Sequence, residues 1–360
     1  TTLVKNIGKK IRKKSVYIDL ELPSDARKLN DAESFLRQQK DKCVIIDEIQ
    51  RMPELFAIIR ALVDIHRIPG RFILLGSASP GLIRGVSESL AGRAIYTELT
   101  PVGLTEITST IKQQKHWFRG GFPQAMTART DSDYRLWMES FVTSYIERDL
   151  PMIFGTNFST SVMRNFWSML AHANGGIWNA ENFARSLGIS APTVNRYLDY
   201  LEGAYLIRKL PAFFINAKKR LVKSPKVYIR DSGLLHKLCE VNTMQQLQGN
   251  LIIGSSWEGY VVEQINQNIS KEYNVYYYRT HDGAESDLVI SHGIKPLSCI
   301  EIKYSNTPSI SKGFYNSLND LKTTQNFIIT PFSETYPYNK TTIACSLSDF
   351  LSNYLNKLRK

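Results

Sequence analysis

The sequence predicts a multidomain α/β protein whose first domain contains a parallel sheet. The chain has 360 residues, enough for two or three domains with separate cores. Residues 43–46 form a short apolar run, typical of a strand buried on both faces of a parallel sheet. A second apolar run, residues 72–75, follows a segment at 53–66 whose apolar positions have helical spacing. Strand, helix and strand in this order indicate a βαβ unit.

Polar side chains follow both predicted strands. Asp47 and Glu48 come directly after the first strand, and Ser77 and Ser79 come after the second. An Asp at this place can hold magnesium and its bound water over a nucleotide, and the next Glu can orient or deprotonate the water that attacks the γ-phosphate. A serine at the end of the second strand would lie near the same phosphate. The alternative is a buried strand followed by a solvated acidic turn.

The next motif is Gly92-Arg93, followed by a predicted strand at residues 94–99. The order of acidic strand, polar strand and Gly-Arg resembles the AAA+ class of P-loop ATPases. More narrowly, the chain resembles a bacterial and archaeal ATPase family whose carboxyl-terminal part is a domain of unknown function with a nuclease-like core. Four motifs carry this resemblance: DEIQRMP at 47–53, LLGSASP at 74–80, AGR at 91–93 and YIERDL at 145–150. It implies ATP and Mg²⁺ as cofactors. Arg93 would act on the γ-phosphate of a neighbouring subunit if the protein forms homo-oligomers.

The phosphate-binding loop of such an ATPase, GxxxxGK[ST], does not occur in these residues. The chain opens with Thr1-Thr2-Leu3-Val4, the way a Walker A helix continues after its Gly-Lys. We therefore expect the glycines and Lys to precede Thr1, with Thr1 as a magnesium ligand and Thr2 beside the nucleotide. The alternative is an unremarkable amino terminus.

The charge of the chain favours a polyanionic partner, most simply DNA. Lys and Arg number 45 against 33 Asp and Glu, which gives a net charge of +12. Residues 208–230 contain eight basic residues and no acid, alternating with apolar positions, and predict a basic β-hairpin. The eight are Arg208, Lys209, Lys218, Lys219, Arg220, Lys223, Lys226 and Arg230.

Two short helices, residues 181–187 and 191–202, are predicted before this hairpin around a Gly-Ile-Ser turn. Helix, turn, helix and basic hairpin together resemble a winged helix-turn-helix. Ser190 is the expected cap of the second helix. Seven residues are predicted to contact nucleic acid: Thr193, Asn195, Arg196, Lys218, Lys219, Arg220 and Lys223. The alternative is a structural winged helix that only packs domains together.

The last third carries a second constellation: Glu258 on a predicted helix, Asp287 on a strand, and Glu301 and Lys303 on the next strand. This layout resembles the PD-(D/E)xK nuclease fold. Asp287 and Glu301 on adjacent strands can share a magnesium ion, and Lys303 is on the same face as Glu301 because side chains alternate with period two. Lys303 would position water or neutralise the phosphorane. The alternative is a nuclease-derived domain that binds without cutting.

These observations predict four parts: an ATPase core (1–110), a helical lid (111–165), a winged helix (166–232) and a nuclease-like domain (233–360). The predicted function is an ATPase coupled to DNA binding and a nuclease-like domain. The alternative is a nucleotide-gated switch or adaptor with a degenerate, non-cleaving core. No apolar run approaches the roughly 18 residues of a membrane span. Four scattered cysteines without a CxxC motif favour reduced thiols, no zinc site and a cytoplasmic location.

Overall fold

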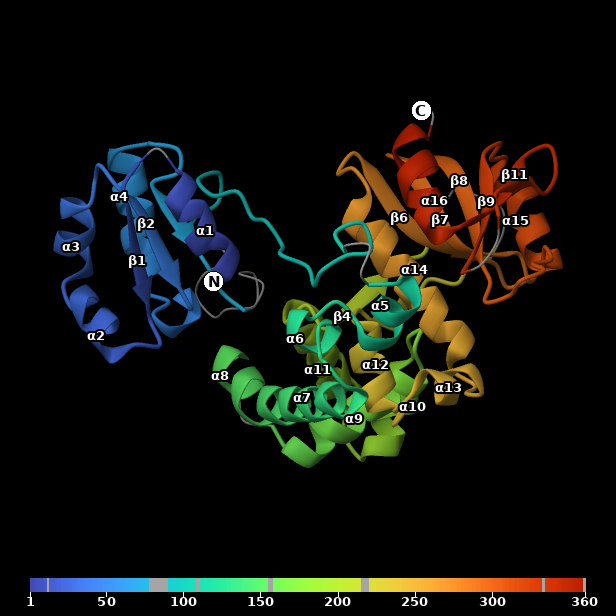
Figure 1. Cartoon of the computed structure of the whole chain (residues 1–360), viewed down its shortest axis with the longest axis horizontal. Helices are drawn as coiled ribbons and strands as arrows, with labels where there is room; N and C mark the ends of the chain where they lie inside the picture. The colour runs from blue at the N-terminus through green and yellow to red at the C-terminus, as the bar shows by residue number, and fades with distance from the viewer. Residues whose placement is uncertain are drawn as a thin grey trace. The chain divides into compact units, whose positions relative to one another are not determined.

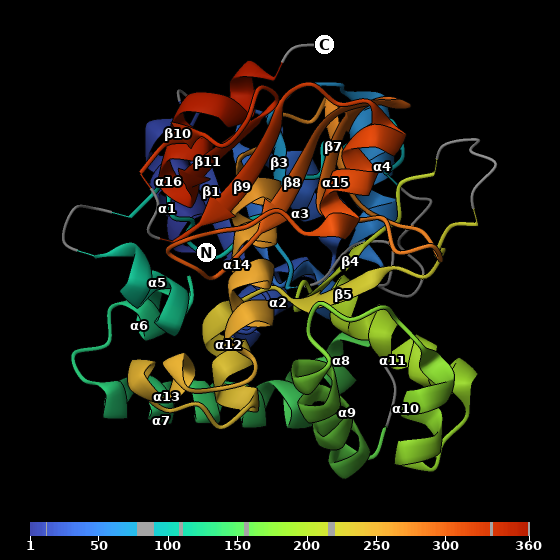
Figure 2. The ribbon, with the colours of Figure 1, turned by 90° about the vertical axis from the view of Figure 1, so that its right-hand side faces the viewer.

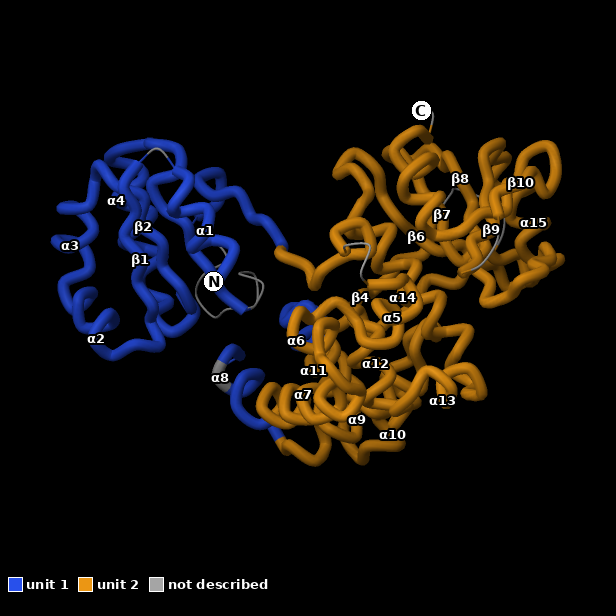
Figure 3. Tube along the Cα trace, viewed as in Figure 1, with its two compact units in different colours: residues 1–98, 147–158, 199–205 blue, residues 99–146, 159–198, 206–360 orange. Residues whose placement is uncertain are grey.

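The computed structural model describes residues 1–11, 13–77, 90–107, 111–154, 158–214, 220–331 and 334–358. The chain divides into two compact units, which Figure 3 distinguishes by colour. The first comprises residues 1–98, 147–158 and 199–205, and the second comprises residues 99–146, 159–198 and 206–360. No helix in the described ranges has both the length and the apolar character needed to cross a membrane. All four cysteines are free thiols.

The first unit contains a three-stranded parallel sheet in the order β1-β2-β3 (Figure 1). Every residue of the central strand β2 is buried, as the apolar run at 43–46 predicts. The predicted βαβ unit is therefore confirmed. The elements of this sheet region are α1 (Thr2–Lys10), β1 (Ser15–Asp19), α2 (Pro23–Ala26), η1 (Arg27–Leu29), α3 (Ala32–Gln38), β2 (Cys43–Asp47), η2 (Ile49–Arg51), α4 (Leu55–Ile65) and β3 (Phe72–Leu74).

The strand predicted at residues 94–99 is wrong. These residues have no regular secondary structure, and Ile95 is 93% exposed. Strand propensity reflects packing against neighbours on a half-buried sheet, so an apolar segment that packs on no sheet gains little from it.

Helices make up most of the chain between the two large sheets. The capping box of α7 begins that helix, because Thr130 and Asp133 each accept a hydrogen bond from the other's backbone N–H. The predicted cap of α11 is also present, with the Ser190 hydroxyl accepting from the Thr193 N–H at 3.3 Å. These elements are α5 (Gln113–Arg119), α6 (Pro123–Met126), α7 (Asp131–Ser144), η4 (Tyr145–Asp149), α8 (Leu150–Phe154), α9 (Thr160–His172), α10 (Ala180–Leu187), α11 (Ala191–Gly203), α12 (Ser232–Leu238) and α13 (Met244–Gln248).

A six-stranded mixed sheet, ordered β10-β11-β9-β8-β7-β6, organises the carboxyl-terminal third (Figure 2). Strands β6, β7 and β8 are antiparallel neighbours, whereas β8, β9 and β11 run parallel. The strands predicted to carry Asp287 and Glu301 both belong to this sheet, as β7 and β8, and Lys303 directly follows β8. Its elements are α14 (Ile253–Asn268), β6 (Tyr273–Arg279), β7 (Glu285–His292), β8 (Lys295–Ile302), α15 (Lys312–Leu321), β9 (Asn326–Thr330), β10 (Tyr336–Pro337), β11 (Thr342–Ser346), α16 (Leu347–Asp349), η5 (Phe350–Tyr354) and η6 (Leu355–Lys357).

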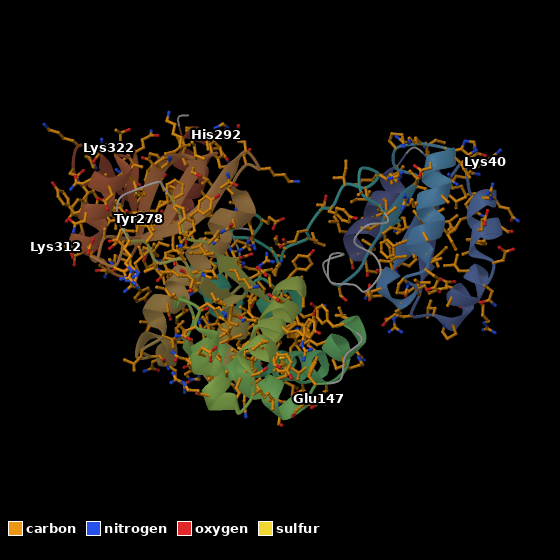
Figure 4. The ribbon with its side chains drawn as sticks, turned by 180° about the vertical axis from the view of Figure 1, so that it is seen from behind. Lys40, Glu147, Tyr278, His292, Lys312 and Lys322 are labelled. Atoms are coloured by element: carbon orange, nitrogen blue, oxygen red, sulfur yellow. The ribbon has the colours of Figure 1, made fainter. Side chains whose placement is uncertain are left out.

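Alternation along β7 gives the sheet two buried faces. Leu288 and Ile290 pack in one core with Trp257 of α14, and Val289 packs in another with Phe314 of α15. Tyr278 of β6, labelled in Figure 4, belongs to the α15 side and donates its hydroxyl hydrogen to Asp320 at 3.0 Å. Helices therefore cover both faces of this sheet.

The predicted basic hairpin forms a two-stranded antiparallel sheet of β4 (Ile207–Leu210) and β5 (Lys226–Ile229). The chain after β4 departs from the prediction, because Phe213 does not extend this hairpin. Its N–H donates to the Tyr277 carbonyl of β6 at 2.7 Å, and its side chain is buried. Ala212 and Phe213 are thus attached to β6 of the six-stranded sheet.

One buried core joins the helices and the six-stranded sheet of the second unit. It includes Trp117 of α5, Tyr228 of β5, Trp257 of α14 and Phe327 of β9. All four are aromatic and come from elements far apart in sequence, and Trp117 and Trp257 meet edge to face at 5.3 Å between centroids. Strand β5 and helix α14 are therefore held in fixed register by a shared core.

Candidate functional site

Asp47, at the carboxyl end of β2, is buried and lies beside the first residue of the chain. Its Oδ2 accepts a hydrogen bond from the Thr1 hydroxyl at 2.7 Å and another from the Tyr17 hydroxyl. Burial, together with the Asp47 carboxylate, raises the pKa of Tyr17, so Tyr17 stays a donor. The predicted pair of magnesium ligands, Thr1 and Asp47, is thus brought together. Oxygen ligands of this kind suit a hard cation such as Mg²⁺.

Glu48 and Ser77 are linked through Gln50. The Gln50 side-chain N–H₂ group donates to the Glu48 carboxylate and lies 3.1 Å from the Ser77 hydroxyl. Glu48 has a left-handed backbone with φ of 58°, a conformation that is uncommon for a residue other than glycine. Burial raises the pKa of Glu48. The polar ends of β2 and β3 therefore form one network, in which Gln50 is a residue that the sequence did not single out.

Three other residues predicted for this site, Thr2, Ser79 and Arg93, have no described contact with Asp47, Glu48 or Ser77. Thr2 is exposed at the start of α1, and Ser79 lies outside the described residues. Arg93 forms an ion pair within its own chain, with its Nε 2.7 Å from Asp64 Oδ1. That pair would have to open before Arg93 could act on a second subunit.

The predicted nucleic-acid contacts of α11 are partly engaged inside the chain. The Asn195 side-chain oxygen accepts from the Trp178 indole at 2.9 Å, and the Thr193 hydroxyl lies 2.9 Å from that of Ser190. Thr193 is half-buried, because its side chain takes part in the helix cap. Arg196, Arg220 and Lys223 are exposed, whereas Lys218 and Lys219 lie outside the described residues.

Three of the basic residues predicted for the hairpin surface face inward instead. Arg208 and Arg230 both bind the buried carboxylate of Glu263 on α14, at 2.7 Å each. Lys226 is also buried, with 4% of its surface exposed. Their charge is therefore neutralised within the protein, which the count of basic residues in the sequence could not reveal.

The acidic residues of the predicted nuclease-like site converge. Leu288 of β7 pairs with Ile300 of β8, so Asp287 and Glu301 occupy the next opposed positions of the two strands. Asp287 Oδ2 accepts from the Ile302 N–H at 2.9 Å, and Lys303 Nζ lies 2.8 Å from Glu301 Oε1. We call Glu258, Glu285, Asp287 and Glu301 the acid cluster. Glu258 joins it from α14 through a cation that it shares with Asp287.

That cation is the ammonium group of Lys226, which the sequence did not assign to this site. Its Nζ lies 3.0 Å from Glu258, 3.6 Å from Glu285 and 3.6 Å from Asp287. Tyr228, two residues further along β5, donates to Glu258 at 2.6 Å. The alternation of Lys226, Tyr228 and Arg230 along one strand was the available signal, because period two places all three on one face.

Electrostatics in the cluster agree with this geometry. Burial acts to lower the pKa of Lys226, but the charges of Glu258, Asp287 and Glu285 outweigh it and raise the pKa above its usual value. Burial and the neighbouring Asp287 charge raise the pKa of Glu301 to about 6. In the described ranges, no three His, Cys, Asp or Glu side chains are placed so that they could hold a metal ion.

Three families match successive parts of the chain. Residues 1–108 match a family described as an AAA domain, residues 111–245 match a domain of unknown function, DUF8612, and residues 253–350 match another, DUF4143. No solved structure gives a significant match. The first match confirms the AAA assignment predicted from the strands around Asp47 and Ser77. It indicates an ATPase-type nucleotide-binding function.

Curated relatives cover nearly the whole chain. The uncharacterized proteins Rv2008c of Mycobacterium tuberculosis and Mb2031c of Mycobacterium bovis are each 38% identical over 98% of this chain and 78% of their own length. The chain belongs to the same family as these mycobacterial proteins. The uncharacterized protein MJ1544 of Methanocaldococcus jannaschii is also similar, being 22% identical over 88% of this chain and 75% of its own length.

Proposed function

We propose that the first domain is a magnesium-dependent ATPase site that drives a nucleic-acid-binding and nuclease-like second unit. The observation that carries the ATPase part is the 2.7 Å hydrogen bond between the hydroxyl of Thr1 and the carboxylate of Asp47, at the end of a fully buried parallel strand. A hydroxyl and a carboxylate at this place are the protein ligands that Mg²⁺ takes in P-loop ATPases.

The side chains around Asp47 have separate tasks in this proposal. Mg²⁺, when bound, neutralises charge on the phosphate oxygens. Thr1 and Asp47 hold it, and Tyr17 keeps Asp47 oriented through its hydrogen bond. Glu48 orients the attacking water and takes a proton from it, and its raised pKa suits a group that must accept that proton. Gln50 positions Glu48 and links it to Ser77, which would lie near the γ-phosphate of a bound nucleotide.

Calorimetry with ATP and MgCl₂ tests the proposal. It compares this chain with a version in which a GxxxxGK sequence is placed before Thr1. ATP should bind the version with the loop and bind this chain far more weakly, because the loop supplies the Lys and most phosphate contacts. Equal, tight binding by both would contradict the role given to Thr1. Asp47→Asn should weaken magnesium-dependent binding in the version with the loop.

The second unit has two candidate activities. In the first, Asp287, Glu301 and Lys303 cleave nucleic acid held by the winged helix-turn-helix. In the second, the protein is a nucleotide-gated switch or adaptor whose nuclease-like core binds without cutting. The position of Lys226 between Glu258 and Asp287 favours the second, because an ammonium group already compensates these acids. Magnesium-dependent nicking of supercoiled plasmid, compared with Lys303→Ala, distinguishes the two. Nicking that Lys303→Ala abolishes supports the first candidate, and no nicking by either protein supports the second.

A further inference from the structure

We propose that Lys226 is the resident cation of the acid cluster and replaces the divalent metal that a nuclease-like core would need there. The acid cluster then binds the ammonium group of Lys226, on strand β5 of the segment that matches DUF8612, instead of a metal ion. This inference rests on the nuclease-like arrangement proposed for the second unit and is independent of nucleotide hydrolysis by the AAA domain.

The first support is the position of the ammonium group. Lys226 Nζ lies within 3.6 Å of carboxylate oxygens from three residues, Glu258, Glu285 and Asp287. These residues come from α14 and β7, and the Lys226 side chain is 5% exposed. A buried charge is tolerated only when it is paired, and here one lysine compensates several acids that would otherwise repel one another.

The second support is that two further carboxylate oxygens of the acid cluster already have partners within the protein. Asp287 Oδ2 accepts from the Ile302 backbone, and Glu301 Oε1 faces Lys303. Glu258 Oε1, which faces Lys226, also accepts from the Tyr228 hydroxyl. A magnesium ion needs near-octahedral oxygen ligands at about 2.0–2.1 Å. The arrangement of the acids around Lys226 does not fit such an ion.

The third support is that Lys226 cannot easily leave, because β5 is fixed along both edges. On one edge it pairs with β4 from Ile207 to Leu210. On the other, the Gly175 N–H donates to Val227 and the Val227 N–H donates to Gly176, at 2.8 and 3.1 Å. The Asn174 side chain also accepts from the Ile229 N–H and donates to the Ser255 carbonyl of α14. Asn174 thereby couples the strand that carries Lys226 to the helix that carries Glu258.

Gly175 and Tyr277 contact the chain on either side of Lys226, at Tyr228 and Ser224. Gly175 has φ of +77°, and a Cβ added there would lie 3.1 Å from the Tyr228 ring, so this turn is built for close approach to β5. The Tyr277 hydroxyl donates to the Ser224 carbonyl, two residues before Lys226. The entry of the chain into β5 is therefore held by the same sheet that carries Asp287.

The test is Mn²⁺ binding, measured by calorimetry and electron paramagnetic resonance with MnCl₂ alone on the whole chain. The wild-type protein should not bind Mn²⁺ at the cluster. Lys226→Met keeps the length of the side chain and removes its charge. The carboxylates then repel one another without a compensating cation, so Mn²⁺ affinity should rise by about tenfold or more. Adding Asp287→Asn to Lys226→Met should abolish the gain, and Lys226→Arg should not produce it. Lys295→Met, on the exposed start of β8, is the matched control and should leave Mn²⁺ binding unchanged.

Thermal melting keeps the test decisive if Lys226→Met is unstable. A metal that binds only the folded protein raises its melting temperature, so MnCl₂ should stabilise Lys226→Met and leave the wild type unchanged. Tight Mn²⁺ binding by the wild type at Asp287 would overturn the inference and favour a metal-dependent nuclease. So would a Lys226→Met protein that gains neither affinity nor thermal stabilisation. Neither result would affect the ATPase proposal, which calorimetry with ATP tests separately.

Discussion

The guanidinium group of Arg230 lies 2.7 Å from the carboxylate of Glu263, and both side chains are buried. Arg230 belongs to the segment that matches DUF8612 and Glu263 to the segment that matches DUF4143. Arg208 binds the same carboxylate from β4. With Lys226 and Tyr228 on Glu258, this places two separate polar contacts between the β4–β5 strand pair and α14. The two matched domains are thus joined by buried charge as well as by a shared apolar core.

Glu263→Gln should destabilise the protein by about 3–5 kcal/mol at pH 7, because it leaves two guanidinium groups without their buried counter-charge. Denaturant unfolding measures this loss. Glu139→Gln is the matched control, since Glu139 is 67% exposed and its Lys237 partner is 3.4 Å away. The control should cost less than about 1 kcal/mol. An equally small effect of Glu263→Gln would show that the ion pairs of Glu263 with Arg208 and Arg230 do not stabilise the folded protein.

The ion pairs of Glu263 with Arg208 and Arg230 also predict that the free energy of unfolding depends on pH. Burial acts to raise the pKa of Glu263, but Arg208 and Arg230 outweigh it and lower the pKa to about 2, from an ordinary value of 4.5. A carboxylate with a lowered pKa contributes stability that is present above pH 4.5 and is lost as the pH falls toward 2. The difference between wild type and Glu263→Gln should therefore shrink over that window. A difference that stays constant down to pH 2 would contradict the charge interaction.

His236 predicts a second pH dependence in a different window. It is fully buried, with its ring nitrogens 2.8 Å from the Phe118 carbonyl and 2.7 Å from the Ser256 hydroxyl, and burial lowers its pKa to about 4. The unfolded chain binds a proton below pH 6.5 and the folded chain does not, so wild-type stability should fall between pH 6.5 and 4. One such group contributes up to about 1.4 kcal/mol per pH unit.

His236→Asn should remove this contribution and flatten the dependence of unfolding free energy on pH between 6.5 and 4. His172→Asn is the control, because His172 is exposed and only its Nδ1 contacts the Ser168 carbonyl. Unfolding by urea at several pH values provides the measurement. Slopes that remain the same in His236→Asn and wild type would mean that other groups, including the buried His116, set the acid sensitivity.

Local patterns in the sequence predicted the ATPase strands because each depends on a few adjacent residues. The run that ends at Asp47 needs only apolar residues and an acid at the right place, and parallel strands bring their carboxyl ends to one edge. The contact between Thr1 and Asp47 followed from the motif that each belongs to. Gln50 was not predicted because its contact with Glu48 depends on the left-handed backbone at Glu48, which no local sequence pattern indicates.

The role of Lys226 could not be predicted for a different reason. A lysine in a basic segment is usually solvated, and its pairing with Glu258 and Asp287 is a tertiary contact across 32 and 61 residues of sequence. The sequence did identify the acids, because Glu301 and Lys303 have strand spacing. It could not show which cation compensates them. The same limit applies to Arg208 and Arg230, whose shared partner Glu263 lies on α14.

Glu48→Gln should separate nucleotide binding from hydrolysis in a protein with a complete phosphate-binding loop. The substitution removes the carboxylate that accepts a proton from water but leaves Asp47 and Thr1 in place, so ATP affinity should change little. Turnover should fall by about 10²-fold or more, the usual contribution of a general base. Phosphate release measures turnover. Glu54→Gln, an exposed acid before α4, should leave both quantities unchanged. A parallel loss of binding and turnover would mean that Glu48 acts on the nucleotide and not on water.

The exposed part of the segment between β4 and β5 should carry non-specific nucleic-acid affinity that depends steeply on salt. Among the eight basic residues at 208–230, Lys226 and Arg230 are buried and Arg208 is half-buried, whereas Arg220 and Lys223 are exposed. Each neutralised phosphate releases close to one counterion, so replacing Lys218, Lys219 and Arg220 with Ala should flatten the slope of log affinity against log salt by about 2–3 units. Fluorescence anisotropy with a labelled duplex, between about 50 and 200 mM salt, measures this slope.

The control replaces three exposed lysines elsewhere in the second unit, Lys271, Lys295 and Lys312, and removes the same charge. A net-charge effect would flatten both slopes equally, whereas direct phosphate contact would flatten the first alone. An unchanged first slope would remove the segment from the nucleic-acid interface and leave α11 and its exposed Arg196 as the surface to test.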